Sequence, residues 1–135
     1  MRGLLADVNC EGQVEVLVAI FLSKTWKGVW RELNLSLETF TSAGLPRRAL
    51  DVEVWQLCQK LQLLLITRNR NRRGADSLEA AISELNQPDS LPVITLTNAD
   101  RILGSKLYAN RVAERLLDYL IDLDKYRGTG RLWVP

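Results

Sequence analysis

The sequence predicts an α/β fold, a three-layer α/β/α sandwich with a mainly parallel central sheet, formed by residues 1–135 as a single domain. Three short apolar runs without polar alternation are typical of strands covered on both faces, as in a parallel sheet. Segments with helical periodicity separate these runs, so strands and helices alternate along the chain. A length of 135 residues suits one domain and leaves little room for two.

The first third of the chain predicts a strand, a helix and a second strand. In Met1–Val8, the apolar run Gly-Leu-Leu-Ala stops at Asp7 and predicts a buried strand. From Gln13 apolar residues recur at helical spacing until Lys24–Lys27 (Val14, Leu17, Val18, Phe21 and Leu22). Alternation of apolar and polar residues then predicts a half-exposed strand over residues 33–38. Thr41–Pro46 has the composition of a turn.

The middle of the chain predicts a helix followed by a second buried strand. The helix begins near Arg47–Asp51, and its apolar stripe comprises Leu50, Val54, Leu57, Cys58 and Leu61. Leu61–Thr67 is an unbroken apolar strand that ends in a run of arginines and asparagines.

The last part predicts two helices and two strands. Asp76, followed by Glu79 three residues later, is an N-cap signature for a helix. After a loop that contains Pro88, Pro92–Leu96 predicts a third buried strand. A long helix is expected over about 106–124, and a short strand near the C-terminus. The side chains expected to point inward from the long helix are Leu107, Val112, Leu116, Leu120 and Leu123.

Composition and charge exclude several classes of protein. The chain contains no histidine, which excludes Ser-His-Asp and Cys-His catalysis and His-ligated zinc. No apolar run approaches the ~18 residues of a membrane-spanning helix. Asp7 interrupts the N-terminus before a signal-peptide core can form, so we expect a cytoplasmic protein with reduced cysteines and no membrane contact. The net charge of +2 does not by itself indicate nucleic-acid binding.

Polar residues follow each predicted buried strand. In a parallel sheet these positions converge at one edge, where the functional crevice lies. The convergent residues are Asp7 and Asn9, then Arg68, Asn69 and Asn71, then Asn98 and Asp100, with Asp51 and Asp76 at the starts of helices on the same edge.

The acids at this edge suit a hard divalent cation. Asp7, Asp51 and Asp76 are candidate ligands for Mg²⁺ or Mn²⁺, and Asn69 supplies a neutral fourth oxygen. The alternative is that Asp51 and Asp76 simply cap helices. Asp7 favours a functional role, because a carboxylate that ends a buried strand needs a partner.

Four arginines lie within residues 68–73, namely Arg68, Arg70, Arg72 and Arg73. Guanidinium groups suit bidentate contacts with phosphate, so this run is a candidate RNA contact, with a solvated loop as the alternative. Trp26 and Trp30 suit base stacking or, more simply, packing or an oligomer contact. We expect Trp55 and Trp133 to pack inside the protein.

Short motifs in the first 75 residues resemble the PIN-like domains, a compact nuclease fold. Leu-Leu-Ala-Asp-Val-Asn, ending at Asn9, resembles the family's opening Leu-Leu-x-Asp-Glu-Asn. Asp51-Val-Glu-Val-Trp resembles the segment that opens its second helix, and Leu63–Asn71 is similar to its strand Val-Leu-Ile-Thr-x-Asp-x-Asp. The resemblance implies a metal-dependent ribonuclease, such as the toxin of a toxin–antitoxin pair.

The chain departs from that pattern at two positions, because Asn69 and Asn71 stand where the family has acids. An amide keeps an oxygen donor but removes a negative charge, which weakens the binding of a cation. Two leading functions therefore stay open, and a doubly wound small-molecule binder is a weaker third, because no glycine-rich fingerprint follows any strand. The first is a Mg²⁺- or Mn²⁺-dependent ribonuclease in which Asp7, Asp51, Asn69 and Asp76 form the catalytic site and Arg68 positions phosphate. The second is a degenerate PIN-like domain that binds RNA or a protein. RNA, an antitoxin protein and a second copy of the chain are the expected partners.

Overall fold

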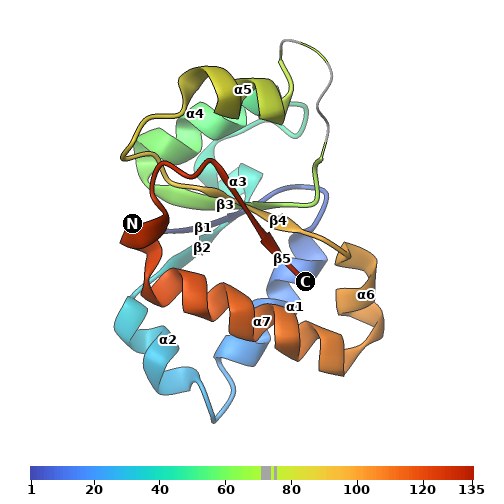
Figure 1. Ribbon diagram of the computed structural model, residues 1–135. Helices are drawn as coiled ribbons and strands as arrows, with labels where there is room; N and C mark the ends of the chain where they lie inside the picture. The colour runs from blue at the N-terminus through green and yellow to red at the C-terminus, as the bar shows by residue number, and fades with distance from the viewer. Residues whose placement is uncertain (71–73, 75) are drawn as a thin grey trace.

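The structure is a computed structural model that describes residues 1–70, 74 and 76–135. The predicted fold class is confirmed, because in this part of the chain five parallel strands form one sheet between two layers of helices (Figure 1). In chain order the strands are β1 (Gly3–Ala6), β2 (Ser36–Glu38), β3 (Leu63–Thr67), β4 (Val93–Leu96) and β5 (Arg131–Val134).

The strands lie in the order β2-β1-β3-β4-β5. The three predicted buried strands are therefore neighbours, as expected, with Ala6 opposite Ile66 and Ile66 opposite Ile94. The chain order reverses between β1 and β3, and in open parallel sheets such a reversal opens a crevice beyond the carboxyl ends of the strands. Asp7 and Asn69 follow the two strands that border this reversal.

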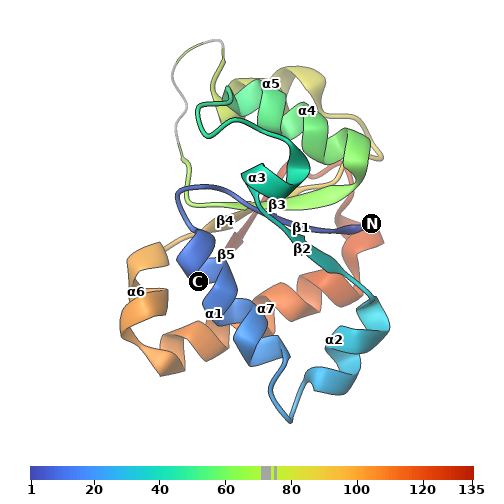
Figure 2. The ribbon, with the colours of Figure 1, turned by 180° about the vertical axis from the view of Figure 1, so that it is seen from behind.

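The helices divide between the two faces of the sheet (Figure 2). One layer contains α1 (Glu11–Phe21), α2 (Lys27–Leu33), α6 (Ala99–Gly104) and α7 (Lys106–Ile121), and a short 3-10 helix, Leu123–Tyr126, follows α7. The other contains α3 (Phe40–Ala43), α4 (Asp51–Leu61) and α5 (Leu78–Leu85). Among the residues that the structure describes, no helix is both long and apolar enough to cross a membrane.

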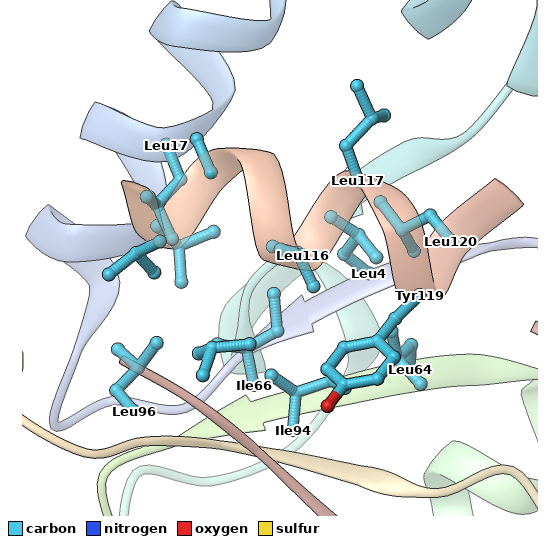
Figure 3. Packing of buried hydrophobic residues seen from close by; sticks show 14 of the residues in the cluster. Leu4, Leu17, Leu64, Ile66, Ile94, Leu96, Leu116, Leu117, Tyr119 and Leu120 are labelled. Atoms are coloured by element: carbon cyan, nitrogen blue, oxygen red, sulfur yellow. The ribbon is translucent and has the colours of Figure 1, made fainter. Parts of the chain in front are cut away.

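Alternate residues of the buried strands contribute to two separate cores. Leu4, Leu64 and Ile66 pack toward the α7 layer, where Leu116 and Leu120 lie over them (Figure 3). Leu5 and Leu65 pack toward α4 on the opposite face. Successive strand side chains point to opposite faces, so a sheet covered on both sides requires continuous apolar strands. These strands hold the polar residues that follow them in a fixed register at the carboxyl edge.

The segment after α1 differs from the prediction. Residues 27–33 form helix α2, and Asn34 ends it with a left-handed backbone (φ 51°). The predicted alternation over residues 33–38 is therefore part helix and part strand β2, which has three residues. Trp30 stacks on Phe21 with ring centres 5.0 Å apart, so it has a packing role.

Further differences concern the number of helices, their boundaries, one inward-facing residue and one cap. The predicted turn after residue 40 begins with the short helix α3, and α6 precedes the predicted long helix, which ends at Ile121. Leu107 does not point inward, because 75% of its surface is exposed while Tyr108 beside it is buried. Ser77, not Asp76, caps α5, since its side chain accepts a hydrogen bond from the Ala80 N–H.

Candidate functional site

The carboxyl ends of β1 and β3 meet through a hydrogen bond between side chains. Thr67, the last residue of β3, is fully buried and donates its hydroxyl to Oδ2 of Asp7 at 2.7 Å. The parallel pairing of β1 with β3 ends at Ala6 and Ile66, so the next residues, Asp7 and Thr67, lie side by side. Asp7 thus has the partner that a carboxylate at the end of a buried strand needs.

Asn69 connects this pair to Asp51 on α4. The Asn69 backbone N–H donates to Thr67 Oγ1 at 2.9 Å, and its side-chain Nδ2 donates to Asp51 Oδ2 at 2.9 Å. The same Asp51 oxygen accepts the backbone N–H of Leu78, the first residue of α5, at 3.0 Å. A continuous hydrogen-bonded chain therefore runs from Asp7 through Thr67 and Asn69 to Asp51.

Asp51 is both a candidate site residue and a helix cap. The alternative interpretation expected a cap, but at the start of α4, whereas Asp51 caps α5. Its carboxylate binds the N-terminus of α5, where free N–H groups and the helix dipole favour negative charge. The start of its own helix, α4, is closed by Glu53, whose side chain accepts the Leu50 N–H.

The surroundings of Asp7 disfavour its negative charge. Burial raises the pKa of Asp7 above its usual value, and repulsion from Asp51 adds to this rise. Hydrogen bonds from Thr67 and from the Val8 and Asn9 backbone lower the pKa and offset part of it. Asp7 and Asp51 are therefore close enough to repel one another.

The two cysteines are buried thiols with a raised pKa. Burial, with a further contribution from the charge of Asp7, raises the pKa of both Cys10 and Cys58 to about 12. A thiol with such a pKa stays protonated at neutral pH, and the thiolate is the form that binds metals and attacks substrates.

Asp76, the third predicted ligand, lies apart from this chain of hydrogen bonds. Its side chain is exposed, and no described residue forms a hydrogen bond or ion pair with it. Glu79 and Asp100, the other acids near this edge, pair with Arg131 and Arg68. Within the described ranges, no group of three His, Cys, Asp or Glu side chains is arranged to hold a metal ion.

The donor set does not fit the Mg²⁺ or Mn²⁺ centre that the resemblance implies. Such a centre needs several anionic oxygens directed at one point. Here two carboxylates are present, and Oδ2 of Asp51 already accepts two hydrogen bonds. Asn69 directs its donor nitrogen toward Asp51, where a metal site requires an oxygen directed at a cation.

The predicted arginine run is described at two of its four positions. Arg68 forms an ion pair with Asp100 at 3.2 Å, and its backbone N–H donates to Asn9 Oδ1 at 3.4 Å. Arg70 is exposed and donates to the Thr97 carbonyl. Arg72, Arg73 and Asn71 lie outside the described residues.

Arg131, in β5, belongs to the site although sequence reasoning did not select it. Its side chain is 9% exposed and donates to the Asn69 carbonyl at 3.0 Å, to Thr95 Oγ1 at 2.5 Å and to Glu79 at 3.1 Å. One guanidinium thus joins β4, β5, α5 and the segment after β3. The signal in the sequence was an arginine in a short C-terminal strand, a position that usually faces solvent.

Trp133, predicted to pack inside the protein, is instead 41% exposed. Its ring lies 5.4 Å from the Arg70 guanidinium carbon and 5.6 Å from that of Arg131, both within cation–π range. Trp55, in contrast, is buried as predicted.

Comparisons with protein-family models, with curated proteins and with solved structures gave no match to this chain.

Proposed function

We propose that this chain is a degenerate PIN-like domain that binds single-stranded RNA at the carboxyl edge of its sheet and does not cleave it. The observation that carries the proposal is the 2.9 Å hydrogen bond from Asn69 Nδ2 to Asp51. In the family that the sequence resembles, an acid stands at this position. The amide gives Asp51 a hydrogen-bond donor, so the acid has a partner without a cation.

RNA binding is supported by the cationic groups at the same edge. Arg68 and Arg70 are exposed next to the Asp7–Asn69 chain, and the exposed Trp133 ring lies beside Arg70. Proteins bind single strands by combining cationic contacts to phosphates with aromatic surfaces for the bases. Double-stranded RNA is recognised mainly by its shape across a wide minor groove, which suits this local cluster less well.

One observation favours the metal-dependent ribonuclease as a second candidate. Asp7 and Asp51 still repel one another, and such a pair gains stability when a divalent cation lies between the two carboxylates. The two candidates differ in a simple outcome, since the ribonuclease shortens RNA in the presence of Mg²⁺ or Mn²⁺ and the degenerate domain leaves its length unchanged.

The test is fluorescence anisotropy with a labelled single-stranded RNA, first in chelator and then in Mg²⁺, with the RNA length checked on a gel. We expect binding in chelator, with a dissociation constant on the order of 1–100 µM, as for other sequence-independent contacts. The double variant Arg68→Gln/Arg70→Gln loses most of this affinity. The matched control is Arg111→Gln/Arg115→Gln, which removes two exposed arginines from α7 and retains binding.

Two results contradict the proposal. Equal losses in the two double variants mean that the affinity comes from overall charge. Chelator-sensitive shortening of the RNA by the unmodified chain supports the ribonuclease instead.

A further inference from the structure

A polar groove of about 210 Å³ lies at the carboxyl end of β4, beside the hydrogen bonds that join Asp7 through Thr67 to Asn69. Its lining includes the guanidinium groups of Arg68 and Arg70 together with Thr97, Asn98 and Asp100. Thr97, Asn98 and Asp100 are exposed, so the groove is open to solvent. Two guanidiniums and an amide in one small groove offer several N–H donors to one ligand.

The groove already holds one anionic group, which is the carboxylate of Asp100. Its Oδ1 lies 3.2 Å from Arg68 Nη1, and the Asp100 side chain is 80% exposed. An ion pair this exposed contributes little stability, so another anion can replace it at small cost. Arg68 donates one nitrogen to Asp100, and a guanidinium has five N–H donors in a planar fork.

A phosphate group is the anion that suits this groove best. Its tetrahedral oxygens can accept hydrogen bonds from two guanidiniums at once, whereas the Asp100 carboxylate accepts one from Arg68. The backbone of Arg68 is fixed on the other side by its hydrogen bond to Asn9, next to Asp7. Arg68 therefore lines the groove and, through its backbone, contacts Asn9 beside Asp7.

We propose that this groove is a phosphate subsite. In its unliganded form the Asp100 carboxylate forms an ion pair with Arg68, and a phosphate group displaces that carboxylate when it binds. The inference rests on the proposed RNA-binding function for the source of that phosphate. Inorganic phosphate shares the same chemistry and serves as the second probe. Asp100 thereby acts as an internal competitor that lowers the affinity of the groove for anions.

The test compares Asp100→Asn with Asp122→Asn. Both variants remove one negative charge from an acid paired with a basic residue, but Asp122 pairs with Lys125 and lies near Met1, at the amino end of β1. Inorganic phosphate is titrated into each protein while amide NMR signals are followed. A labelled single-stranded RNA is titrated in parallel by anisotropy.

We expect phosphate to shift the amide signals of residues 98–100 and the side-chain signal of Arg68. Asp100→Asn tightens binding of both probes by about 1.5- to 5-fold, the range that an exposed ion pair spans. Asp122→Asn leaves the phosphate affinity unchanged. Arg68→Gln, whose far-ultraviolet circular dichroism is checked against the unmodified chain, loses the phosphate shifts.

Equal tightening by Asp100→Asn and Asp122→Asn overturns the subsite, as does a phosphate titration that leaves residues 98–100 unshifted. Two mixed outcomes separate the subsite from the proposed function. If RNA does not bind but phosphate binds as expected, the phosphate subsite is confirmed and the proposed RNA-binding function is wrong. If RNA binds but Asp100→Asn behaves like Asp122→Asn, RNA binding is confirmed and the proposed phosphate subsite is wrong.

Discussion

Asn69 determines the chemistry of the site more than any other residue. Its side-chain nitrogen donates to Asp51, its backbone nitrogen donates to Thr67, and its carbonyl accepts from Arg131. An aspartate here keeps the two backbone contacts but replaces a donor by an acceptor that faces another carboxylate. An amide in place of an acid at position 69 therefore changes the net charge of the site and also supplies the hydrogen bond to Asp51.

Asn69→Asp is expected to lower the free energy of unfolding by about 1–3 kcal/mol, because Asp51 loses a hydrogen-bond donor and gains a like charge. Mn²⁺ then restores stability, since it binds the acids of the folded variant. Thermal unfolding with and without Mn²⁺ measures both effects. Asn98→Asp, the same change at an exposed position of this edge, is the control and shows little of either. A variant as stable as the unmodified chain without metal contradicts the assigned role of Asn69.

Asp7→Asn is expected to stabilise the chain at neutral pH. The pKa of Asp7 is raised on folding, so the folded state binds its proton more tightly than the unfolded state. The stability from this group is fully present below the unfolded pKa and is lost as pH rises through the folded pKa. Asparagine carries no such charge and still accepts the Thr67 hydroxyl.

The variant therefore gains about 0.5–2 kcal/mol at pH 7, the range that stabilising substitutions commonly give, and little near pH 3. Urea unfolding across this pH range measures the difference. A loss of stability at pH 7 contradicts this expectation, and a loss that persists at pH 3 means that the Asp7 carboxyl group is needed for its hydrogen bonds whatever its charge.

At the scale of elements, Arg131 joins the short C-terminal strand to the site. Arg131→Met is expected to cost about 2–4 kcal/mol, because the buried Thr95 hydroxyl and the Asn69 carbonyl both lose a donor. Glu79→Gln is expected to cost less than about 1 kcal/mol, since Glu79 is 38% exposed. Denaturant unfolding of the two variants checks this order. A larger loss in Glu79→Gln means that the ion pair, not the buried hydrogen bonds, holds β5 in place.

The buried strands could be predicted from the sequence because burial on both faces leaves a direct mark, a mostly apolar run in which polar residues do not alternate with apolar ones. Their common edge followed from the rule for parallel sheets, and Asp7, Asp51 and Asn69 meet there. The geometry at Asp76 could not be predicted, because both Asp76 and Ser77 are good N-caps and only the backbone conformation selects Ser77.

Short helices left weaker marks than the strands. Helix α2 contains Gly28 and has seven residues, so its helical propensity is low and its stability comes from packing of Trp30 on Phe21. The contacts of Arg131 depend on the pairing of β5 with β4, which a single strand of four residues does not specify.

At the scale of the whole molecule, both edges of the sheet carry acids as well as bases. Arg68 and Arg70 lie at the carboxyl edge with Asp7, Asp51 and Asp100, and at the opposite edge Asp122 and Asp124 pair with Lys125 and Arg127. Since the net charge is only +2, the proposed RNA binding depends on local guanidinium contacts and not on the charge of the whole molecule. The expected homodimer and the expected antitoxin contact stay predictions.

Binding of single-stranded RNA is therefore expected to weaken with salt, with a slope of about −0.7 in log affinity against log salt for each phosphate contacted. Arg68→Gln reduces the magnitude of this slope by about 0.7, because it removes one contact. Anisotropy titrations at several salt concentrations give both slopes. Identical slopes for the two proteins indicate that Arg68 contacts no phosphate.

The central claim is that the Asn69 amide takes the place of a cation beside Asp51. The measurement that tests this claim most directly is a Mn²⁺ titration followed by NMR. Bound Mn²⁺ broadens the signals of nearby amides, so a site between Asp7 and Asp51 broadens Val8, Asn9 and Asn69. We predict that substoichiometric Mn²⁺ leaves these signals sharp in the unmodified chain and broadens them in Asn69→Asp. Selective broadening of the same signals in the unmodified chain contradicts a site in which Asn69 replaces the cation.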